Sequence, residues 1–237
     1  MAYPYTFTLR EFNEFGAIYK YAVIKTEIGK AKPEIINTQM QQKPHIGING
    51  GFFAADNGYS SPPTGIRSIS YWNGDTTSYA YNGTSSAQYS RKTFVSYKDG
   101  TGVMRATHIY ASNLNEVLAN YPTAQAVIGG TDYNEDSWTG GLPGLPSYSI
   151  ANWRTVLAWD STSAYMIVTA NRSVNIPTLK RHMETLGYNP TNSVILDGSG
   201  STSMRVAQND VINWYGSPTH DRYIGNMVRV YGIDFFG

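Results

Sequence analysis

An aspartate at the end of an apolar segment is the first group in this sequence that could carry chemistry. Residues 194–204 read VILDGSGSTSM, so a run of β-forming residues delivers Asp197 into a loop of glycine, serine and threonine. Glycine has no Cβ, and a loop with so little bulk lets another group approach its main chain closely. Backbone N–H groups bared in this way can bind an anionic or sugar oxygen beside the carboxylate. The alternative is a tight turn with a solvated aspartate.

A second loop of the same kind follows the segment HIGIN (45–49). The sequence INGGFFAADNGYSSPPTGI (48–66) bares its backbone at Gly50 and Gly51, and two phenylalanines then anchor the loop. Asn49 carries an amide that can bind a hydroxyl or a phosphate oxygen. A Gly-Gly turn with core aromatics is the competing interpretation. Two such loops, about 150 positions apart, predict one pocket built where strands end.

Cations and a histidine complete the set of reactive candidates. Arg154 and Arg222 each stand near the start of a predicted strand, where a guanidinium can bind phosphate or carboxylate with two parallel hydrogen bonds. Taken alone, each is more typical of a solvated surface. The glycine loop lacks the lysine of a phosphate-binding loop, and no G-x-S-x-G or H-E-x-x-H pattern occurs. A hydrolase triad of Ser199 or Ser201 with His220 and an aspartate stays open.

The metal question also stays open. Four loop carboxylates could bind calcium, although their spacing matches no known calcium loop and solvated charges are the simpler interpretation: Asp56, Asp132, Glu135 and Asp136. The four histidines show no metal-ligand spacing. We expect no cofactor, and the sequence leaves a divalent metal undecided.

Short strands and two helices must position these residues. Apolar and alternating patterns predict strands at 19–26, 45–49, 93–98, 102–110, 124–130, 193–197 and 226–236, and a hairpin of 155–160 with 164–170. One helix is predicted within 112–121, capped by Ser112 or Asn113. Another runs from Pro177 towards a C-terminal Gly187 and leads into the strand before Asp197. The Gly- and Pro-rich stretch 136–149 reads as a long active-site loop.

Composition bounds the class of protein. The chain has 237 residues, 41% hydrophobic and 15% charged, which is typical of a globular protein with a buried core. Its net charge of +1 gives no electrostatic reason to expect nucleic acid or a membrane surface as partner, and the absence of cysteine excludes disulfides. The N-terminal sequence shows no secretory signal and no segment could span a bilayer, so we expect a cytoplasmic protein at synthesis. We predict a single α+β domain over 1–237, with a mixed β-sheet core and few flanking helices.

The motifs together resemble the phosphodiester glycosidase family. INGGFF, Gly65, WRT, ILDGSGSTSM and RYIGNMVRVYG follow the order of that family's motifs over about residues 45–234. The chain departs from the family pattern at three places. Ser199 replaces a glycine of the aspartate loop, Trp153 replaces a proline, and Ala170–Asn171 stand before Arg172 where an Asp-Gly pair is common.

The resemblance implies hydrolysis of a sugar 1-phosphodiester, an N-acetylglucosamine type being the family's example, with cleavage between the anomeric carbon and the phosphate oxygen. It implies Asp197 as the essential carboxylate, Arg154 and Arg222 as phosphate ligands, Asn49 as part of an amide cradle, and His220 as a reserve proton donor. The remaining residues expected to bind substrate are Gly50, Gly51, Gly65, Gly198, Ser199, Gly200, Ser201, Thr202, Arg172 and Asn226.

Two other function classes remain open. The chain could be a carbohydrate-binding or structural module of a phage or bacterial surface apparatus, using its 19 tyrosines, with the motif loops as a retained scaffold. It could also be a metal-dependent phosphodiesterase that cleaves the P–O bond. A sugar-phosphate or glycan is the expected partner in each case, and the oligomeric state is undetermined.

Overall fold

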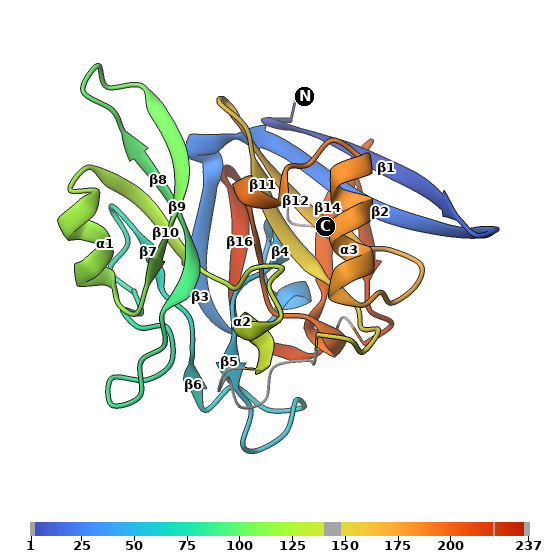
Figure 1. Cartoon of the computed structure of the whole chain (residues 1–237), viewed down its shortest axis with the longest axis horizontal. Coiled ribbons are helices and arrows are strands. Elements are labelled where there is room, and N and C mark those ends of the chain that lie inside the picture. Colours follow the sequence, from blue (N-terminus) through green and yellow to red (C-terminus); the bar gives the residue numbers. More distant parts are fainter. Residues whose placement is uncertain (1–2, 140–147, 220, 235–237) are drawn as a thin grey trace.

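A computed structural model describes residues 3–139, 148–219 and 221–234 of the chain, and Figure 1 shows their arrangement. Three main sheets form the described part, and every pairing between its named strands is antiparallel. The first sheet has the order β1-β2-β12-β11-β13. Its strands are β1 (Tyr5–Glu14), β2 (Ala17–Glu27), β12 (Ser163–Thr169), β11 (Thr155–Trp159) and β13 (Ser193–Ile195).

The second sheet carries β4, the strand that precedes the first glycine loop, between β14 and β16. Its order is β15-β14-β4-β16-β3. Its strands are β15 (Val211–Gly216), β14 (Ser203–Gln208), β4 (His45–Asn49), β16 (Tyr223–Asp234) and β3 (Ala31–Gln39).

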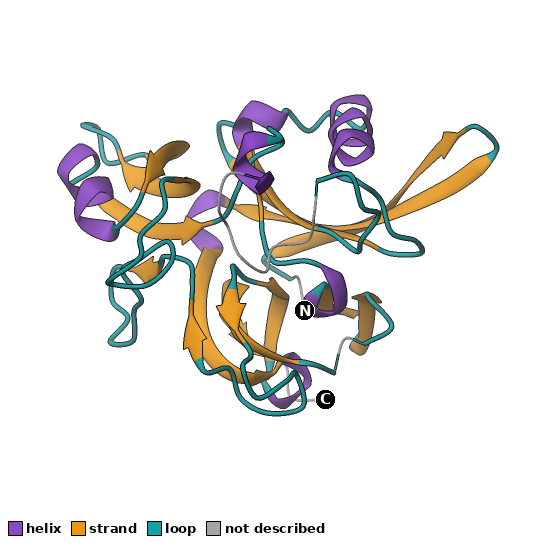
Figure 2. Cartoon of the chain, turned by 60° about the horizontal axis from the view of Figure 1, so that its bottom comes forward, coloured by secondary structure: helices purple, strands orange, loops and turns teal. Residues whose placement is uncertain are grey.

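The third sheet and a small ribbon flank these two. The third sheet has the order β7-β10-β8-β9, and β5 pairs with β6 in the ribbon. These strands are β7 (Ser70–Trp72), β10 (Ala124–Gly129), β8 (Arg91–Lys98), β9 (Met104–Ala111), β5 (Phe53–Ala54) and β6 (Gly65–Ile66). The β1–β2 hairpin extends beyond the other strands of its sheet in both views (Figures 1 and 2).

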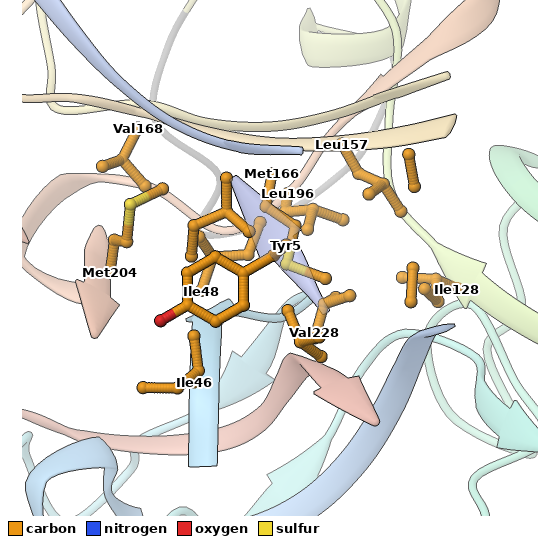
Figure 3. Packing of buried hydrophobic residues seen from close by; sticks show 14 of the residues in the cluster. Tyr5, Ile46, Ile48, Ile128, Leu157, Met166, Val168, Leu196, Met204 and Val228 are labelled. Carbon is orange, nitrogen blue, oxygen red and sulfur yellow. The ribbon is translucent and has the colours of Figure 1, made fainter. Parts of the chain in front are cut away.

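The main core lies between the first and second sheets. Leu157 and Met166 of the first sheet share one buried cluster with Ile48 and Val228 of the second, and Figure 3 shows these side chains together. Because alternate residues of a strand point to opposite faces, β2 buries both of its faces, with Ile24 in this cluster and its neighbour Val23 in another. The sheets therefore hold the ends of β4 and β13 on one rigid support.

Helices α1 (Leu114–Asn120), α2 (Asp136–Thr139) and α3 (Ile176–Thr185) complete the fold. The α3 helix covers the outer face of the first sheet, where its Leu179 and Met183 join the cluster of Val23 and Ile167. Four short 3-10 turns accompany them: η1 (Ile28–Lys30), η2 (Met40–Gln42), η3 (Pro190–Asn192) and η4 (Ser199–Ser201). Among the described residues, no helix has the length and apolar character needed to cross a membrane.

Both helices begin at asparagine caps, of which Asn113 was predicted and Asn175 was not. The Asn113 side chain accepts a hydrogen bond from the Glu116 N–H at the start of α1, and Asn175 accepts one from Thr178 at the start of α3. After α3, Gly187 adopts φ +89° and its N–H donates to the Glu184 carbonyl, the left-handed ending that favours glycine. Both helix predictions are confirmed.

The α+β fold class with a β-sheet core and few helices is confirmed. The predicted hairpin is present, with Thr155 opposite Val168 and Trp159 opposite Ala164. The strand pattern did not reveal seven of the described strands: β1, β3, β5, β6, β7, β14 and β15. The mostly exposed β1 is an edge strand whose residues alternate between apolar and polar from Tyr5 to Arg10, and the adjacent charges Arg10 and Glu11 break this alternation. The domain bounds 1–237 stay a prediction, and residues 140–147 and 235–236 of two predicted segments lie outside the described residues.

Candidate active site

One side-chain hydrogen bond and one main-chain hydrogen bond join the two glycine loops. Asn49, the last residue of β4, donates from Nδ2 to the Asp197 carbonyl at 2.7 Å across 148 positions of sequence. The Asp197 N–H in turn donates to the Gly50 carbonyl at 3.1 Å. The prediction that these distant loops meet around one carboxylate is therefore confirmed.

Asn49 itself does not reach the pocket. It is 1% exposed, and its Oδ1 accepts hydrogen bonds from Thr155 Oγ1 at 2.7 Å and from the Ser203 N–H at 3.0 Å. Since both ends of the amide are used by protein groups, the expected contact with substrate is wrong. Asn49 positions the Asp197 main chain from behind.

The aspartate loop has small residues because other protein groups pack directly against its main chain. A Cβ on Gly198 would lie 2.7 Å from the Trp153 carbonyl, and one on Gly200 would collide with the Arg222 guanidinium. Ser199, which stands where the family has glycine, adopts φ +56° and donates its N–H to Trp153 at 2.9 Å. The loop has glycines at these positions because the Trp153 carbonyl and the Arg222 side chain pack directly against its main chain.

Asp197 lies in the wall of a pocket with a volume of about 600 Å³. Its side chain is half-buried, and burial raises the pKa of its carboxyl to about 6. A hydrogen bond from Ser201, the Gly198 N–H and the charge of Arg222 oppose that rise. The carboxyl can therefore change protonation state near neutral pH, which suits acid–base or electrostatic work.

Three arginines line the same pocket: Arg67, Arg91 and Arg222. The Arg222 guanidinium carbon lies 3.6 Å from the centroid of the Tyr59 ring, a cation–π contact that fixes the side chain in the wall. Four residues that the sequence predicts to bind substrate also lie in this wall: Arg222, Gly198, Ser199 and Ser201. An anionic substrate group would meet several guanidinium groups here.

Arg67 and Arg91 are missing from the sequence prediction. Arg67 follows the motif residue Gly65 by two positions, and a Cβ on Gly65 would lie 2.5 Å from its Nη1, so that motif was the available signal. Arg91 begins β8 in a segment with no motif. Only the packing of the third sheet beside the loops brings Arg91 to the pocket.

Arg154 does not line the pocket, which corrects its predicted role. It is 1% exposed and donates from Nε to the Val174 carbonyl at 3.0 Å and from Nη2 to Ile150 at 2.7 Å. Its guanidinium carbon also lies 5.4 Å from the Trp138 ring centroid. Burial lowers its pKa to about 10, so it stays a cation that ties the segment before β11 together.

Other predicted residues lie around the pocket rather than in its wall. Exposed Arg172 stacks on Tyr19 with 5.1 Å between guanidinium carbon and ring centroid, and it does not line this pocket, so its contact with substrate stays a prediction. Thr202 is fully buried, while Asn226, 2% exposed, packs against Gly50. The backbones of Gly50, Gly51 and Gly65 support the loops, with Gly51 packed on Ser68.

The sequence also left open a proton donor at His220, a serine triad and a metal site. His220 lies outside the described residues, so neither its proton-donor role nor the serine triad is tested. The described residues contain no group of three or more His, Asp or Glu side chains that could hold a metal ion. Asp56 lines the pocket, while Asp132 accepts hydrogen bonds from Tyr110 and Ser137.

The segment that carries this pocket matches a known protein family. The sequence model of the phosphodiester glycosidase family matches residues 42–231, which includes both glycine loops and Arg222. The chain belongs to the phosphodiester glycosidase family. It is an enzyme of the glycosidase class that acts on sugar phosphodiesters.

Two solved structures share the fold. One is the catalytic domain of zebrafish N-acetylglucosamine-1-phosphodiester alpha-N-acetylglucosaminidase, auto-inhibited by its pro-peptide, with a TM-score of 0.64 and 14% identity over 97% of this chain and 83% of that chain. The other is a hypothetical protein from Synechocystis, with a TM-score of 0.57 and 14% identity over 95% of this chain and 62% of that chain. A search of curated protein sequences found no match.

Proposed function

We propose that this phosphodiester glycosidase hydrolyses the C1–O bond of glycosyl 1-phosphodiesters and that Asp197 is its essential carboxylate. One observation carries the proposal: a half-buried carboxyl, with a pKa raised to about 6, shares one cavity with Arg67, Arg91 and Arg222. The cavity thus offers a single tunable carboxyl for the sugar carbon and several cations for the phosphate.

Hydrolysis of a glycosyl 1-phosphodiester needs little help from a second acidic residue that would protonate the leaving group. Water adds its oxygen to C1, the bond between C1 and the phosphate oxygen breaks, and the bonding electrons leave with a phosphate monoester. That leaving group is stable because the second pKa of a phosphate monoester is about 6. Ordinary glycoside hydrolysis, by contrast, uses a pair of opposed carboxylates.

Asp197 and Arg222 stabilise opposite charges of the transition state. Ionised Asp197 accepts a proton from the attacking water or stabilises the positive charge that develops at C1. Arg222 neutralises the growing charge on the leaving phosphate, and its rigid stacking on Tyr59 means that little reorganisation is needed. Asn49 keeps the Asp197 main chain in place through its 2.7 Å hydrogen bond.

The substrate is an N-acetylglucosamine 1-phosphodiester or a close relative in a bacterial or phage-targeted surface polymer. Support for the sugar comes from the name of the zebrafish enzyme with which this chain shares its fold. Support for the phosphodiester comes from the arginines of the pocket.

Hydrolysis in heavy-oxygen water tests the reaction. A synthetic α-N-acetylglucosamine 1-phosphodiester should yield labelled sugar and unlabelled phosphate monoester, and the Asp197→Asn variant should yield neither. Label in the phosphate would instead identify a P–O phosphodiesterase. Saturable binding of a polysaccharide without any turnover would favour the carbohydrate-binding module.

A further inference from the structure

The Arg222 guanidinium is held in the pocket wall without hydrogen bonds. Its main-chain N–H donates to the Thr219 carbonyl at 3.1 Å, but its side-chain N–H groups have no acceptor and no ion-pair partner within the part of the chain that the structure describes. The other pocket arginines differ, because Arg67 Nη1 donates to the Ile66 carbonyl at 2.9 Å and Arg91 Nη1 donates to the Arg67 carbonyl at 3.1 Å. The side-chain donors of Arg222 are therefore free to bind a ligand, and contacts of another kind must fix its position.

Two groups pack against this guanidinium. Its carbon lies 3.6 Å from the centroid of the Tyr59 ring, which is direct stacking of a cation on an aromatic face. At Gly200 there is no room for a Cβ, because the Arg222 guanidinium occupies that space. Stacking covers a face of the planar group and leaves its edge, which carries the N–H donors, for an anionic ligand such as phosphate.

The loop between β5 and β6 carries Tyr59 and is bonded to the segment that carries Arg222. The Tyr223 N–H donates to the Tyr59 carbonyl at 3.1 Å, so the residue that follows Arg222 is tied to the residue whose ring stacks on it. The Phe53 ring meets the Tyr59 ring edge-on, with 6.3 Å between the centroids. Although Tyr59 is 49% exposed, these contacts set the place of its ring in the pocket wall.

The charge of Arg222 also acts on Asp197. Burial raises the pKa of Asp197 to about 6, and hydrogen bonds from Ser201 and the Gly198 N–H, together with the charge of Arg222, oppose that rise. An Arg222 side chain that leaves its place stabilises the carboxylate less, because the attraction between charges falls with distance. The other titratable side chains in the pocket wall are Asp56, Tyr59, Arg67, Tyr89 and Arg91.

We propose that Tyr59 is a positioning residue whose ring holds Arg222 with its N–H edge towards the phosphate and its charge near Asp197. The part of this role that concerns the phosphate rests on the proposed function, and the inference adds a residue that lies outside every motif of the sequence. The Tyr59 hydroxyl forms no hydrogen bond within the described residues, so the aromatic face alone carries the contact. Phenylalanine should therefore replace Tyr59, whereas an aliphatic side chain should not.

Replacing the ring tests this role in the reaction. Tyr59→Leu should lower kcat/KM for a synthetic α-N-acetylglucosamine 1-phosphodiester by about fivefold, the scale of one cation–π contact, and Tyr59→Phe should stay within about twofold of wild type. Calorimetry with inorganic phosphate should show the same order of affinities. Tyr231→Leu is the matched control, because Tyr231 is 40% exposed and its ring centroid lies 5.4 Å from the Arg229 guanidinium carbon, away from the pocket wall. This variant should keep the kcat/KM of wild type.

A cycle of variants isolates the effect that passes from Tyr59 through Arg222 to Asp197. Carbon-13 NMR titration gives the pKa of the Asp197 carboxyl without any need for turnover, in wild type, Tyr59→Leu, Arg222→Gln and the double variant. Tyr59→Leu admits water, which lowers this pKa, and releases Arg222, which raises it. With glutamine at position 222 only the first effect remains, so Tyr59→Leu should shift the pKa further upward when Arg222 is present. Equal shifts in both backgrounds, in protein shown by circular dichroism to be folded, would overturn the inference.

The titration and the kinetics separate this inference from the proposed function. If diesters are hydrolysed at C1 and the two pKa shifts are equal, the inference fails and the proposed function stands. If the shifts differ and no diester is hydrolysed, Tyr59 positions Arg222 and the proposed function fails. If Tyr59→Phe loses as much kcat/KM as Tyr59→Leu, the hydroxyl rather than the ring is required and the inference fails.

Discussion

Removing the Asn49 amide should damage both stability and turnover. In Asn49→Ala, the part-buried Asp197 carbonyl and the buried Ser203 N–H lose hydrogen bonds of 2.7 and 3.0 Å. The Thr155 hydroxyl loses a 2.7 Å bond but has Thr202 Oγ1 at 3.4 Å as a weaker partner. Two stranded polar groups at roughly 1–2 kcal/mol each give a loss of about 3 kcal/mol in the free energy of unfolding. For a chain of this size that corresponds to about 10 °C in Tm.

Turnover should fall further than folding alone explains. The 2.7 Å bond fixes the Asp197 main chain, so its loss should lower kcat by at least about tenfold in protein shown by circular dichroism to be folded. Asn82→Ala is the matched control, because fully buried Asn82 also makes three hydrogen bonds, to Thr93, Ala111 and Ile69, of 2.9, 2.8 and 3.1 Å. It should lose similar stability and keep most of kcat. Equal loss of kcat in both variants would refute the role given to Asn49.

Four further predictions concern the aspartate loop and Arg222. A carboxyl with a pKa raised to about 6 must ionise to act, so kcat/KM should fall as pH drops below about 6, and Asp197→Asn should be inactive at every pH tested. The pKa of Asp197 is higher in the folded protein than in the unfolded chain, so its ionised carboxylate destabilises the fold at pH 7. This destabilisation disappears as pH falls towards 4. Asp197→Asn should therefore raise Tm at pH 7 more than at pH 4. Arg222→Gln removes a charge that lowers the pKa of Asp197, so the acidic limb of its pH–rate profile should move to higher pH, and an unmoved limb would contradict that coupling. Ser199→Gly should raise the free energy of unfolding by about 1 kcal/mol in urea titrations, because Ser199 holds φ +56°; no gain would show that the backbone there is not strained.

Much of the reaction centre could be predicted from short segments. The segments ending at Asn49 and Asp197 are apolar strands followed by glycine loops, and such patterns depend on neighbours in sequence. The helices at 114–120 and 176–185 were predictable for the same reason, since their caps lie within one turn. The family motifs then pointed to the chemistry.

Roles that depend on burial could not be predicted in this way. Arg154 looked like a phosphate ligand from its place before a strand, yet its guanidinium bonds to the carbonyls of Val174 and Ile150. Asn49 looked like a ligand too, but its amide is hydrogen-bonded to Asp197, Thr155 and Ser203. A side chain's partners are set by which segments pack around it, and that information is spread over distant parts of the chain.

Neighbouring residues are enough to predict the local elements: strands by their alternation, helix ends by their caps, and the acidic loop by its glycines. Which cations face the pocket depends on how distant segments pack together. Arg91 reaches it because the third sheet packs beside the loops, so that Arg91 lies against Phe52, while Arg172 is carried to Tyr19 instead. Local patterns report the preferences of neighbouring residues, whereas a site is completed by contacts between segments whose distance apart no local pattern encodes.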